Sequence, residues 1–303
     1  MPRGIVPLLE TPFDEKGAID LESLTRLIHD TISGGVAGLM APLVASEVHA
    51  LSLQEREKVV RHIATVVAGR IPFIVGASSD NVEDCRDFAR LAEGVGASAY
   101  LVAVPQACYG DPDRILEFFQ PIAASSRIPL IIQDLQWNAP GLDLSMICKL
   151  EEQLPTLVGM KIETVPAGPK YTSVRTAMGE GFFISGGWAI PQLIEALDRG
   201  VDAMVPESAL VRVFVAIYRA YARGRRDDAV RLFRQLLPVL AFSNQELYQS
   251  IAFFKRLLAR KGLLRSAAMR APGFEWDRFN ARIADELIAY YLELEARVAD
   301  SED

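Results

Sequence analysis

Lys161 and Glu163 are the residues of this 303-residue chain whose types and spacing most directly suggest chemistry. They close the run LVGMKIE (157–163), which is otherwise apolar and typical of a buried strand. Side chains two residues apart on a strand point the same way, so the two groups should share one environment. Burial disfavours the charged form of a lysine, and the neutral amine is a nucleophile toward ketones. The run therefore predicts a nucleophilic lysine, and a structural lysine paired with Glu163 or Asp134 is the alternative.

Lys161 differs from the other lysines in its setting. The chain has seven lysines against twenty-five arginines, and only Lys161 falls within an apolar strand pattern. The others fall in a turn, in charged helical patterns or in a Gly-Pro segment: Lys16, Lys58, Lys149, Lys170, Lys255 and Lys261. Ionisable groups at the ends of barrel strands are often functional, which favours chemistry at Lys161.

Short apolar runs of strand type alternate with amphipathic helical patterns over most of the chain. The eight runs are 4–10, 37–43, 72–78, 99–105, 130–134, 157–163, 182–187 and 202–207. Such alternation predicts a parallel sheet with helical crossovers, and nearly continuous apolar runs predict strands that are covered on both faces. Eight such units favour an α/β fold of the TIM-barrel type, a (β/α)8 barrel, over an open sheet.

After Ser208 the pattern becomes purely helical. Helical periodicity is predicted over 209–224, 226–242, 244–262 and 274–300. The first of these segments completes the eighth unit of the barrel, and the other three form a C-terminal three-helix extension. We therefore expect a catalytic barrel over 1–224 and a helical extension over 225–303. No linker rich in Gly, Ser or Pro separates the two parts, so they should pack as one unit.

In a barrel of this kind, the carboxyl ends of the strands and the loops after them build the active site. The catalytic candidates selected by this rule are Lys161, Glu163, Asp134 and Gln133. The candidates for binding substrate are Ser46, Glu47, Ser185, Gly186, Gly187, Trp188 and Val205. Other polar residues at strand ends are Glu10, Thr11, Ser78 and Glu207. The pair Gly186–Gly187 predicts either a tight turn or backbone amides aimed at an anion.

Composition narrows the classes of function. Half of the residues are hydrophobic and 23% are charged, which indicates a globular protein. The formal net charge of -7 argues against nucleic acid and against an anionic membrane surface, since both are bound through clustered Lys and Arg. The start of the chain lacks a signal-peptide pattern, and no apolar run is long enough to cross a bilayer, so we expect a cytoplasmic protein. The three cysteines form no CxxC pair, which predicts neither a zinc site nor a disulfide framework.

A metal-dependent mechanism is the competing way to act on a carbonyl group. The three histidines fall in or beside helical patterns without ligand spacing: His29, His49 and His62. A magnesium site made from Glu47, Asp134 and Glu207 is the remaining arrangement, because carboxylates suit that ion. The sequence has no P-loop, no GxGxxG after the first strand and no GxSxG elbow. We expect no metal and no other cofactor.

Four segments of the chain resemble the dihydrodipicolinate synthase and N-acetylneuraminate lyase family, whose members are class I aldolases and dehydratases. The segments are TPFDEKGAID (11–20), ASEVHALSLQER (45–56), GMKIE (159–163) and ISGGWA (184–189). The resemblance covers essentially the whole chain, including the C-terminal helices. It implies that Lys161 forms a Schiff base with a 2-keto acid such as pyruvate. It also implies a homo-oligomer, either a tetramer or a dimer.

Three departures from the family pattern bear on the reaction. Residues 43–46 read Leu-Val-Ala-Ser where the family has Gly-Thr-Thr-Gly, the turn that holds the substrate's carboxylate. Gln133 stands in place of a proton-relaying tyrosine, and an amide does not titrate. The arginine that grips a second substrate carboxylate has no counterpart after Asp134. These differences argue against dihydrodipicolinate synthase activity.

The chain is more similar to a branch of the family that contains 2-keto-3-deoxy-L-arabonate dehydratase. The segments IIQD (131–134), KIETVP (161–166) and ASE (45–47) resemble that branch's Val-Gln-Asp, Lys-Ile-Glu-Thr-Pro and Phe-Ser-Glu. This resemblance implies a lyase that removes water from a 2-keto-3-deoxy sugar acid or a similar 2-keto acid. Trp137 and Trp188 suggest a pocket with a shape of its own.

The expected reaction begins with the substrate's carboxylate held by Ser46 and the turn amides of residues 186–187. Lys161 attacks the ketone, and the protonated imine that results makes the C3 proton acidic. Glu163 is the expected base, because Gln133 cannot titrate. Two alternatives stay open: retro-aldol cleavage that releases pyruvate through the same enamine, and a catalytically silent barrel that only binds a keto acid.

Overall fold

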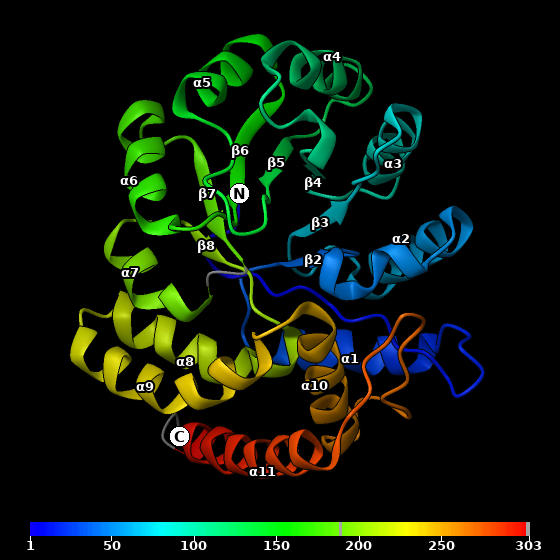
Figure 1. Ribbon diagram of the computed structural model, residues 1–303, viewed down its shortest axis with the longest axis vertical. Helices are drawn as coiled ribbons and strands as arrows, with labels where there is room; N and C mark the ends of the chain where they lie inside the picture. The colour runs from blue at the N-terminus through cyan, green and yellow to red at the C-terminus, as the bar shows by residue number, and fades with distance from the viewer. Residues whose placement is uncertain (188–189, 301–303) are drawn as a thin grey trace.

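A computed structural model describes residues 1–187 and 190–300. Over these residues, eight parallel strands form one sheet in the order β1-β8-β7-β6-β5-β4-β3-β2. The strands are β1 (Gly4–Ile5), β2 (Leu39–Ala41), β3 (Phe73–Gly76), β4 (Ala99–Ala103), β5 (Leu130–Asp134), β6 (Leu157–Ile162), β7 (Phe183–Gly186) and β8 (Ala203–Met204). Leu8 closes the ring, since it bridges Met40 on one side and Glu207 on the other. Figure 1 shows the strands at the centre with helices outside them, so the predicted TIM barrel is confirmed.

A helix follows each strand and covers the outside of the barrel (Figure 1). The barrel helices are α1 (Leu21–Ser33), α2 (Leu53–Val67), α3 (Val82–Gly94), α4 (Pro112–Ala123), α5 (Leu144–Gln153), α6 (Ala167–Met178), α7 (Leu193–Asp198) and α8 (Val211–Ala222). Side chains cap several of the first turns. Asp20 accepts a hydrogen bond from the amide of Ser23, and Ser52 forms a reciprocal capping box with Glu55. These caps are local, so residues close along the chain set where α1 and α2 begin.

Three more helices follow the barrel within the described residues: α9 (Arg226–Ser243), α10 (Leu247–Arg260) and α11 (Arg278–Asp300). Helix α9 packs against α8, and α11 packs against both α8 and α9 (Figure 1). Helix α10 reaches the short turns at 44–46 and 208–210, which lie at the carboxyl ends of β2 and β8. The predicted three-helix extension is therefore confirmed, and the division of the chain at residue 224 stays a prediction.

The last helix begins later than the sequence pattern suggested. Periodicity predicted a start near Phe274, whereas α11 begins at Arg278. A carboxylate oxygen of Asp277 accepts hydrogen bonds from the amides of residues 279–280, at 2.8 and 2.7 Å, and so caps the first turn. Upstream of this cap, the ring of Phe274 packs edge-on against Trp276, with ring centroids 4.9 Å apart.

β1 and β8 are shorter than the runs predicted for them. Pro7 and Pro206 interrupt both runs, and proline has no amide hydrogen to donate to a neighbouring strand. The chain still continues alongside its neighbours. The amide of Leu8 donates to the carbonyl of Pro206 over 3.0 Å, and the amide of Met40 donates to the carbonyl of Pro7 over 2.9 Å. The prolines therefore shorten the two strands without opening the barrel.

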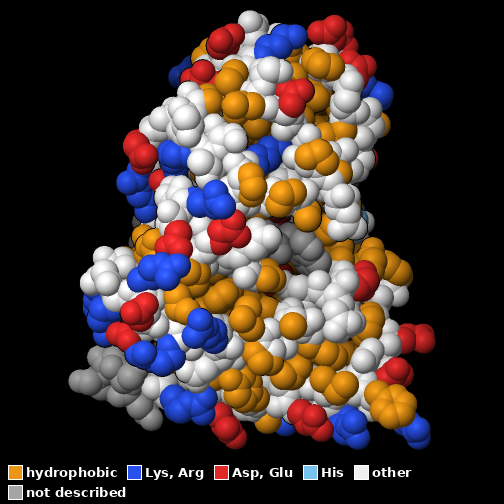
Figure 2. Space-filling model, turned by 60° about the vertical axis from the view of Figure 1, so that its left-hand side comes forward, with side chains coloured by type: hydrophobic (Ala, Val, Ile, Leu, Met, Phe, Trp, Pro, Cys, Tyr) orange, Lys and Arg blue, Asp and Glu red, His pale blue; other side chains and the backbone are white. Residues whose placement is uncertain are grey.

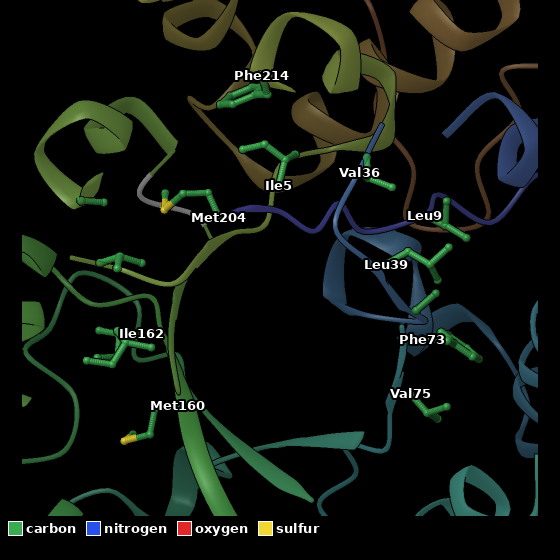
Figure 3. Packing of buried hydrophobic residues seen from close by; sticks show 14 of the residues in the cluster. Ile5, Leu9, Val36, Leu39, Phe73, Val75, Met160, Ile162, Met204 and Phe214 are labelled. Atoms are coloured by element: carbon green, nitrogen blue, oxygen red, sulfur yellow. The ribbon is translucent and has the colours of Figure 1, made fainter. Parts of the chain in front are cut away.

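Two apolar clusters lie on opposite sides of the strands. The outer cluster fills the space between strands and helices and includes Met160, Ile162 and Met204 (Figure 3). The inner cluster fills the barrel and includes Val6, Leu8, Met40, Ile74, Leu101, Ile131 and Phe183. Because side chains alternate along a strand, Lys161 points into the barrel between the outward-facing Met160 and Ile162. β6 therefore delivers the lysine to the carboxyl end of the barrel interior.

The surface carries charges of both signs. On the face in Figure 2, Lys and Arg side chains are interspersed with Asp and Glu. The chain also carries exposed ion pairs within one helix, such as Arg61–Glu57 of α2, and pairs of this kind each contribute little to stability. Across the described part of the chain, no helix combines the length and apolarity that crossing a membrane requires.

Candidate active site

The amine of Lys161 and the carboxylate of Glu163 form an ion pair at the carboxyl end of the barrel interior. Lys161 Nζ lies 2.5 Å from Glu163 Oε1. Both residues are nearly cut off from water, with exposed fractions of 3% and 9%. The backbone amide of Glu163 donates to the carbonyl of Asp134 over 2.9 Å, which holds Glu163 beside the end of β5. The two predicted catalytic groups therefore share one buried environment.

Gln133 lies directly beside Lys161 in the register of the sheet, on the neighbouring strand β5. Its side-chain amide donates a hydrogen bond to Glu163 Oε2, and the residue is buried. Glu163 is thus held from two sides, by an ammonium at one oxygen and by an amide at the other. Of these three residues, only Lys161 and Glu163 have ionisable side chains.

A cavity of about 40 Å³ opens beside the amine. Its polar lining consists of Gln133, Lys161, Glu163, Glu207 and Asn244, and the other lining residues are apolar or glycine. The cavity adjoins a larger groove of about 620 Å³, with which it shares several lining residues that include Trp137. The groove gives a small molecule a route from the surface toward the lysine, as expected of a substrate site.

Gly187 allows the end of β7 to approach the ion pair closely. A Cβ atom at this position would lie 2.6 Å from Lys161 Nζ and would also overlap the carboxylate of Glu163. A side chain at this position would therefore displace the pair. The sequence analysis predicted that Gly187 forms part of a tight turn or contacts an anion. The structure adds this steric role.

The other predicted binding residues of this region occupy different settings. Val205 lines the cavity. A Cβ atom at Gly186 would meet side chains of α6 and β8 rather than the cavity. Ser185 is buried beside Lys161 in the register, with its hydroxyl 3.5 Å from a backbone carbonyl of β6. Trp188 lies outside the described residues, so its part in the pocket stays a prediction.

Ser46 uses its hydroxyl within the protein. The hydroxyl donates to the carbonyl of Leu9 over 2.6 Å and accepts a hydrogen bond from the amide of Leu43 over 3.0 Å. The residue is fully buried, and the neighbouring residues 44–45 line the cavity in its place. The loop after β2 therefore presents backbone and apolar side chains to the cavity. Contact between Ser46 and a substrate stays a prediction.

Lys255 lies in α10, as the helical pattern predicted, but it is not on a charged surface face. It is completely buried and pairs with Glu47, one of the predicted binding residues. Its ammonium also donates to the carbonyl of Ala268 over 2.9 Å and lies 4.3 Å from the ring centroid of Phe13. Burial lowers the pKa of Lys255, and the charge of Glu47 opposes this shift. Helical periodicity did not reveal this burial, because the residues that cover Lys255 come from distant parts of the chain.

The carboxylate of Asp134 points away from Lys161. It is completely buried and pairs with Lys170 of α6. It also accepts hydrogen bonds from the hydroxyl of Tyr109 over 2.9 Å and from the amide of Leu142 over 3.2 Å. Burial, together with Asp134, raises the pKa of Tyr109 far above its usual value, so this hydroxyl keeps its proton. These contacts anchor the loops around the cavity, and a direct catalytic role of Asp134 stays a prediction.

Two further carboxyl groups stand at the carboxyl ends of β1 and β8. Glu207 lines the cavity, and Glu10 is buried next to it. Burial raises the pKa of Glu10 to about 7. Burial also raises the pKa of Glu207 well above its usual range, and the nearby charge of Glu10 adds to this shift. The sequence places both residues at strand ends, but no local signal ranks them above Glu47 or Asp134.

The three carboxylates considered for a magnesium site have separate surroundings. Glu47 pairs with Lys255, Asp134 pairs with Lys170, and Glu207 lines the cavity. Within the residues that the structure describes, no group of three or more His, Cys, Asp or Glu side chains is arranged to hold a metal ion. These carboxylates therefore do not form the site considered for them.

Comparisons with known proteins agree with the motifs. The model of the Dihydrodipicolinate synthetase family matches residues 1–282. The L-2-keto-3-deoxyarabonate dehydratase of Azospirillum brasilense is 27% identical over 276 residues, which cover 89% of this chain and 88% of the relative. The 4-hydroxy-tetrahydrodipicolinate synthase of Brucella abortus biovar 1 (strain 9-941) is 36% identical over 247 residues, which cover 79% of this chain and 82% of the relative.

The fold is shared with solved structures of the same family. The 4-hydroxy-tetrahydrodipicolinate synthase from Methylacidiphilum fumariolicum SolV superposes with a TM-score of 0.89 at 23% sequence identity, covering 99% of each chain. At this identity the likeness concerns the fold alone, whereas the family match spans nearly the whole sequence. The chain belongs to the Dihydrodipicolinate synthetase family and is a lyase.

Proposed function

We propose that this lyase removes water from a 2-keto-3-deoxy sugar acid through a Schiff base on Lys161. The observation that carries the proposal is the buried pair of Lys161 and Glu163 beside a cavity. The third polar neighbour, Gln133, holds Glu163 without offering a titratable proton. Similarity to a protein named as an L-2-keto-3-deoxyarabonate dehydratase supports the class of substrate.

The reaction begins with a proton transfer within the ion pair of Lys161 and Glu163. The Lys161 ammonium passes a proton to Glu163 across 2.5 Å, and the free amine then attacks C2 of the keto acid. Glu163 then returns the proton to the hydroxyl group on C2, which leaves as water and gives a protonated imine. This imine withdraws electrons from C3, and the Glu163 carboxylate takes a C3 proton to leave an enamine. Loss of the C4 hydroxyl completes the dehydration.

The position of Glu163 favours dehydration over aldol cleavage. Dehydration requires a base at C3, whereas retro-aldol cleavage requires a base at the C4 hydroxyl. Glu163 touches the amine itself, so it lies close to C2 and C3 of any substrate attached to that amine. Aldolase chemistry is the second candidate, because a relative that is 36% identical is named a 4-hydroxy-tetrahydrodipicolinate synthase.

We place the substrate's carboxylate against residues 44–45 and Gly187, which line the cavity close to Lys161. This assignment moves the contact away from the Ser46 hydroxyl, whose donor and acceptor positions are engaged with backbone groups. Backbone amides bind a carboxylate without adding charge to a buried site.

Borohydride reduction in the presence of pyruvate tests the Schiff base. We expect the intact mass of the protein to rise by one reduced pyruvate adduct, and Lys161→Ala to show no adduct. Lys58→Ala, on the exposed surface of α2, is the matched control and should react like the unaltered protein. An adduct that persists in Lys161→Ala would refute the role of this lysine. No adduct on the unaltered protein would leave a keto-acid-binding barrel without catalysis.

Incubation with 2-keto-3-deoxypentonates separates the two enzymatic candidates. Dehydration should yield a semialdehyde of the same carbon number, measured by its oxidation in a coupled dehydrogenase assay. Release of pyruvate without the semialdehyde would refute the dehydratase proposal and establish aldol cleavage.

A further inference from the structure

Glu207 is a buried carboxyl group in the cavity that the mechanism above leaves unused. It continues β8 beyond Pro206, and its backbone bridges Leu8 of the neighbouring strand segment. Since Val205 and Glu207 are two residues apart along an extended segment, both face the barrel interior, and both line the cavity beside Lys161. Only 7% of Glu207 is exposed. Among the described residues, no hydrogen-bond donor reaches its Oε2 atom.

Glu10 stands next to Glu207 because β1 and β8 are neighbours in the barrel. It is buried, and the hydroxyl of Ser208 donates a hydrogen bond to its Oε2 atom. The buried ammonium of Lys255 also acts on Glu10 and favours its ionised form. Glu10 therefore has two groups that stabilise a negative charge.

The two carboxyl groups cannot both be ionised cheaply. They are buried side by side, and repulsion between like charges adds to the cost of removing each from water. Burial is the largest cause that raises the pKa of Glu207, and the negative charge of Glu10 is the second cause. Lys161 acts in the opposite direction, but its amine is paired with Glu163. Burial and the charge of Glu10 therefore both favour the protonated form of Glu207.

We propose that Glu207 is a second catalytic residue, which donates its proton to the departing C4 hydroxyl. The proposal rests on the Schiff-base dehydratase function and assigns the acid that this function requires. Glu207 lines the same cavity as Lys161 and Glu163, and one of its carboxyl oxygens is buried without a hydrogen-bond donor. We therefore place a substrate attached to the lysine between the two carboxyl groups. One is the base for C3 and the other is the acid for C4.

Elimination of water starts from the enamine. The nitrogen lone pair re-forms the C2=N bond, and the C2=C3 electron pair moves to make a C3=C4 bond. The C4–O bond breaks with its electrons on oxygen, and the proton of Glu207 converts the leaving group to water. Glu163 has then gained one proton and Glu207 has lost one. A single proton transfer across the cavity restores the starting state.

Glu207→Gln tests the proposal without altering the shape of the site, because an amide resembles a protonated carboxyl group. In D2O, exchange of the C3 protons of the keto acid reports enamine formation, which depends on Lys161 and Glu163. We expect exchange to stay within about threefold of the unaltered protein, and elimination of water to fall about a hundredfold or more, as for the loss of a general acid. Glu152→Gln, an exposed position on α5, is the matched control and should change neither rate.

The outcomes separate this inference from the function on which it rests. Absence of a borohydride adduct or of dehydration in the unaltered protein would overturn both. Elimination by Glu207→Gln at the original rate, with the adduct intact, would overturn the role of Glu207 alone. Equal losses of exchange and elimination would also overturn it, because they would indicate damage before the enamine rather than loss of the acid.

Glu10→Gln gives an independent test through the pH profile. Glu10 is a positioning residue here, since its charge helps to keep the proton on Glu207. Removing that charge takes away an influence that raises the pKa of Glu207. The loss of elimination activity at alkaline pH should therefore move to lower pH, while the borohydride adduct still forms. An unchanged alkaline limb would contradict the coupling between the two carboxyl groups.

Discussion

Gln133 and Gly187 fix the arrangement of the two reactive groups at the level of single residues. The side-chain amide of Gln133 donates to one oxygen of Glu163, and Lys161 occupies the other. Gly187 leaves the space in which the pair lies, since any Cβ atom there would meet both groups. The carboxylate that we propose as the base is therefore held in one orientation before a substrate arrives, which is how preorganised sites gain rate.

Replacing Gln133 with leucine should slow enamine formation while leaving the fold intact. The change removes the amide donor from Glu163 and keeps the volume of the buried side chain. A hydrogen bond to a charged group contributes about 1.5–3 kcal/mol, so exchange of the methyl protons of pyruvate in D2O should fall about ten- to a hundredfold. Gln120→Leu, exposed on α4, is the control and should exchange normally. Exchange by Gln133→Leu at the original rate would show that the amide does not orient the base.

At the scale of elements, the segment between α10 and α11 ties the loops of the barrel together. The guanidinium of Arg270 donates to both carboxylate oxygens of Glu55, at 2.6 and 2.8 Å, near the start of α2. It also donates to the carbonyls of Gly17 and Ala50, at 2.9 and 2.8 Å, and packs 4.5 Å from the ring centroid of Phe13. One side chain from outside the barrel thus fixes the turn before α1 and the loop before α2.

The Arg270–Glu55 pair should make stability depend on pH in acid. The hydrogen bonds from Arg270 are the main cause that lowers the pKa of Glu55 from 4.5 to about 2. Because the pKa is lower in the folded state, this contribution is fully present above about pH 4.5 and is lost as the pH falls toward 2. Arg270→Ala should therefore reduce the free energy of unfolding in urea more at pH 7 than at pH 3.

A matched control for this measurement is Arg61→Ala, which removes an exposed ion pair with Glu57. Such pairs contribute about 1 kcal/mol or less, so the control should unfold much like the unaltered protein at both pH values. An equal loss of stability at pH 7 and pH 3 in Arg270→Ala would indicate that packing, rather than the charge of Glu55, is responsible.

At the scale of the whole molecule, the Lys255–Glu47 ion pair joins the helical extension to the barrel. Lys255 belongs to α10, and Glu47 belongs to the loop after β2 that borders the cavity. Both residues are buried, so their charges depend on one another. The extension therefore supports the active-site face directly. Assembly of the chain into a homotetramer or homodimer stays a prediction from the family.

Removing one partner of this pair should destabilise the whole protein. Lys255→Met removes the ammonium that is paired with the buried carboxylate of Glu47, and breaking such a pair typically costs about 3–5 kcal/mol of unfolding free energy. The double variant Lys255→Met, Glu47→Gln removes both charges of the pair and should recover a large part of that loss. Urea unfolding of the single and double variants measures the coupling. A single variant as stable as the unaltered protein would show that the pair contributes nothing.

The sequence by itself determined the barrel, the order of its elements and the direction of Lys161. Apolar periodicity relates residues that are close along the chain, so it can be read without a structure. The alternation in LVGMKIE is enough to place Lys161 and Glu163 on one face, and the structure finds them 2.5 Å apart.

Only the tertiary structure decided which distant groups meet. Glu207 stands beside Glu10 because β8 pairs with β1, and Lys255 reaches Glu47 because α10 folds back over the barrel. Ser46 and Asp134 likewise engage groups that strand-end position alone could not identify. Burial and charge pairing arise from residues far apart in sequence, and these set the protonation of the site. The sequence therefore pointed to the lysine, whereas only the fold brought Glu207, the proposed acid, into the same cavity.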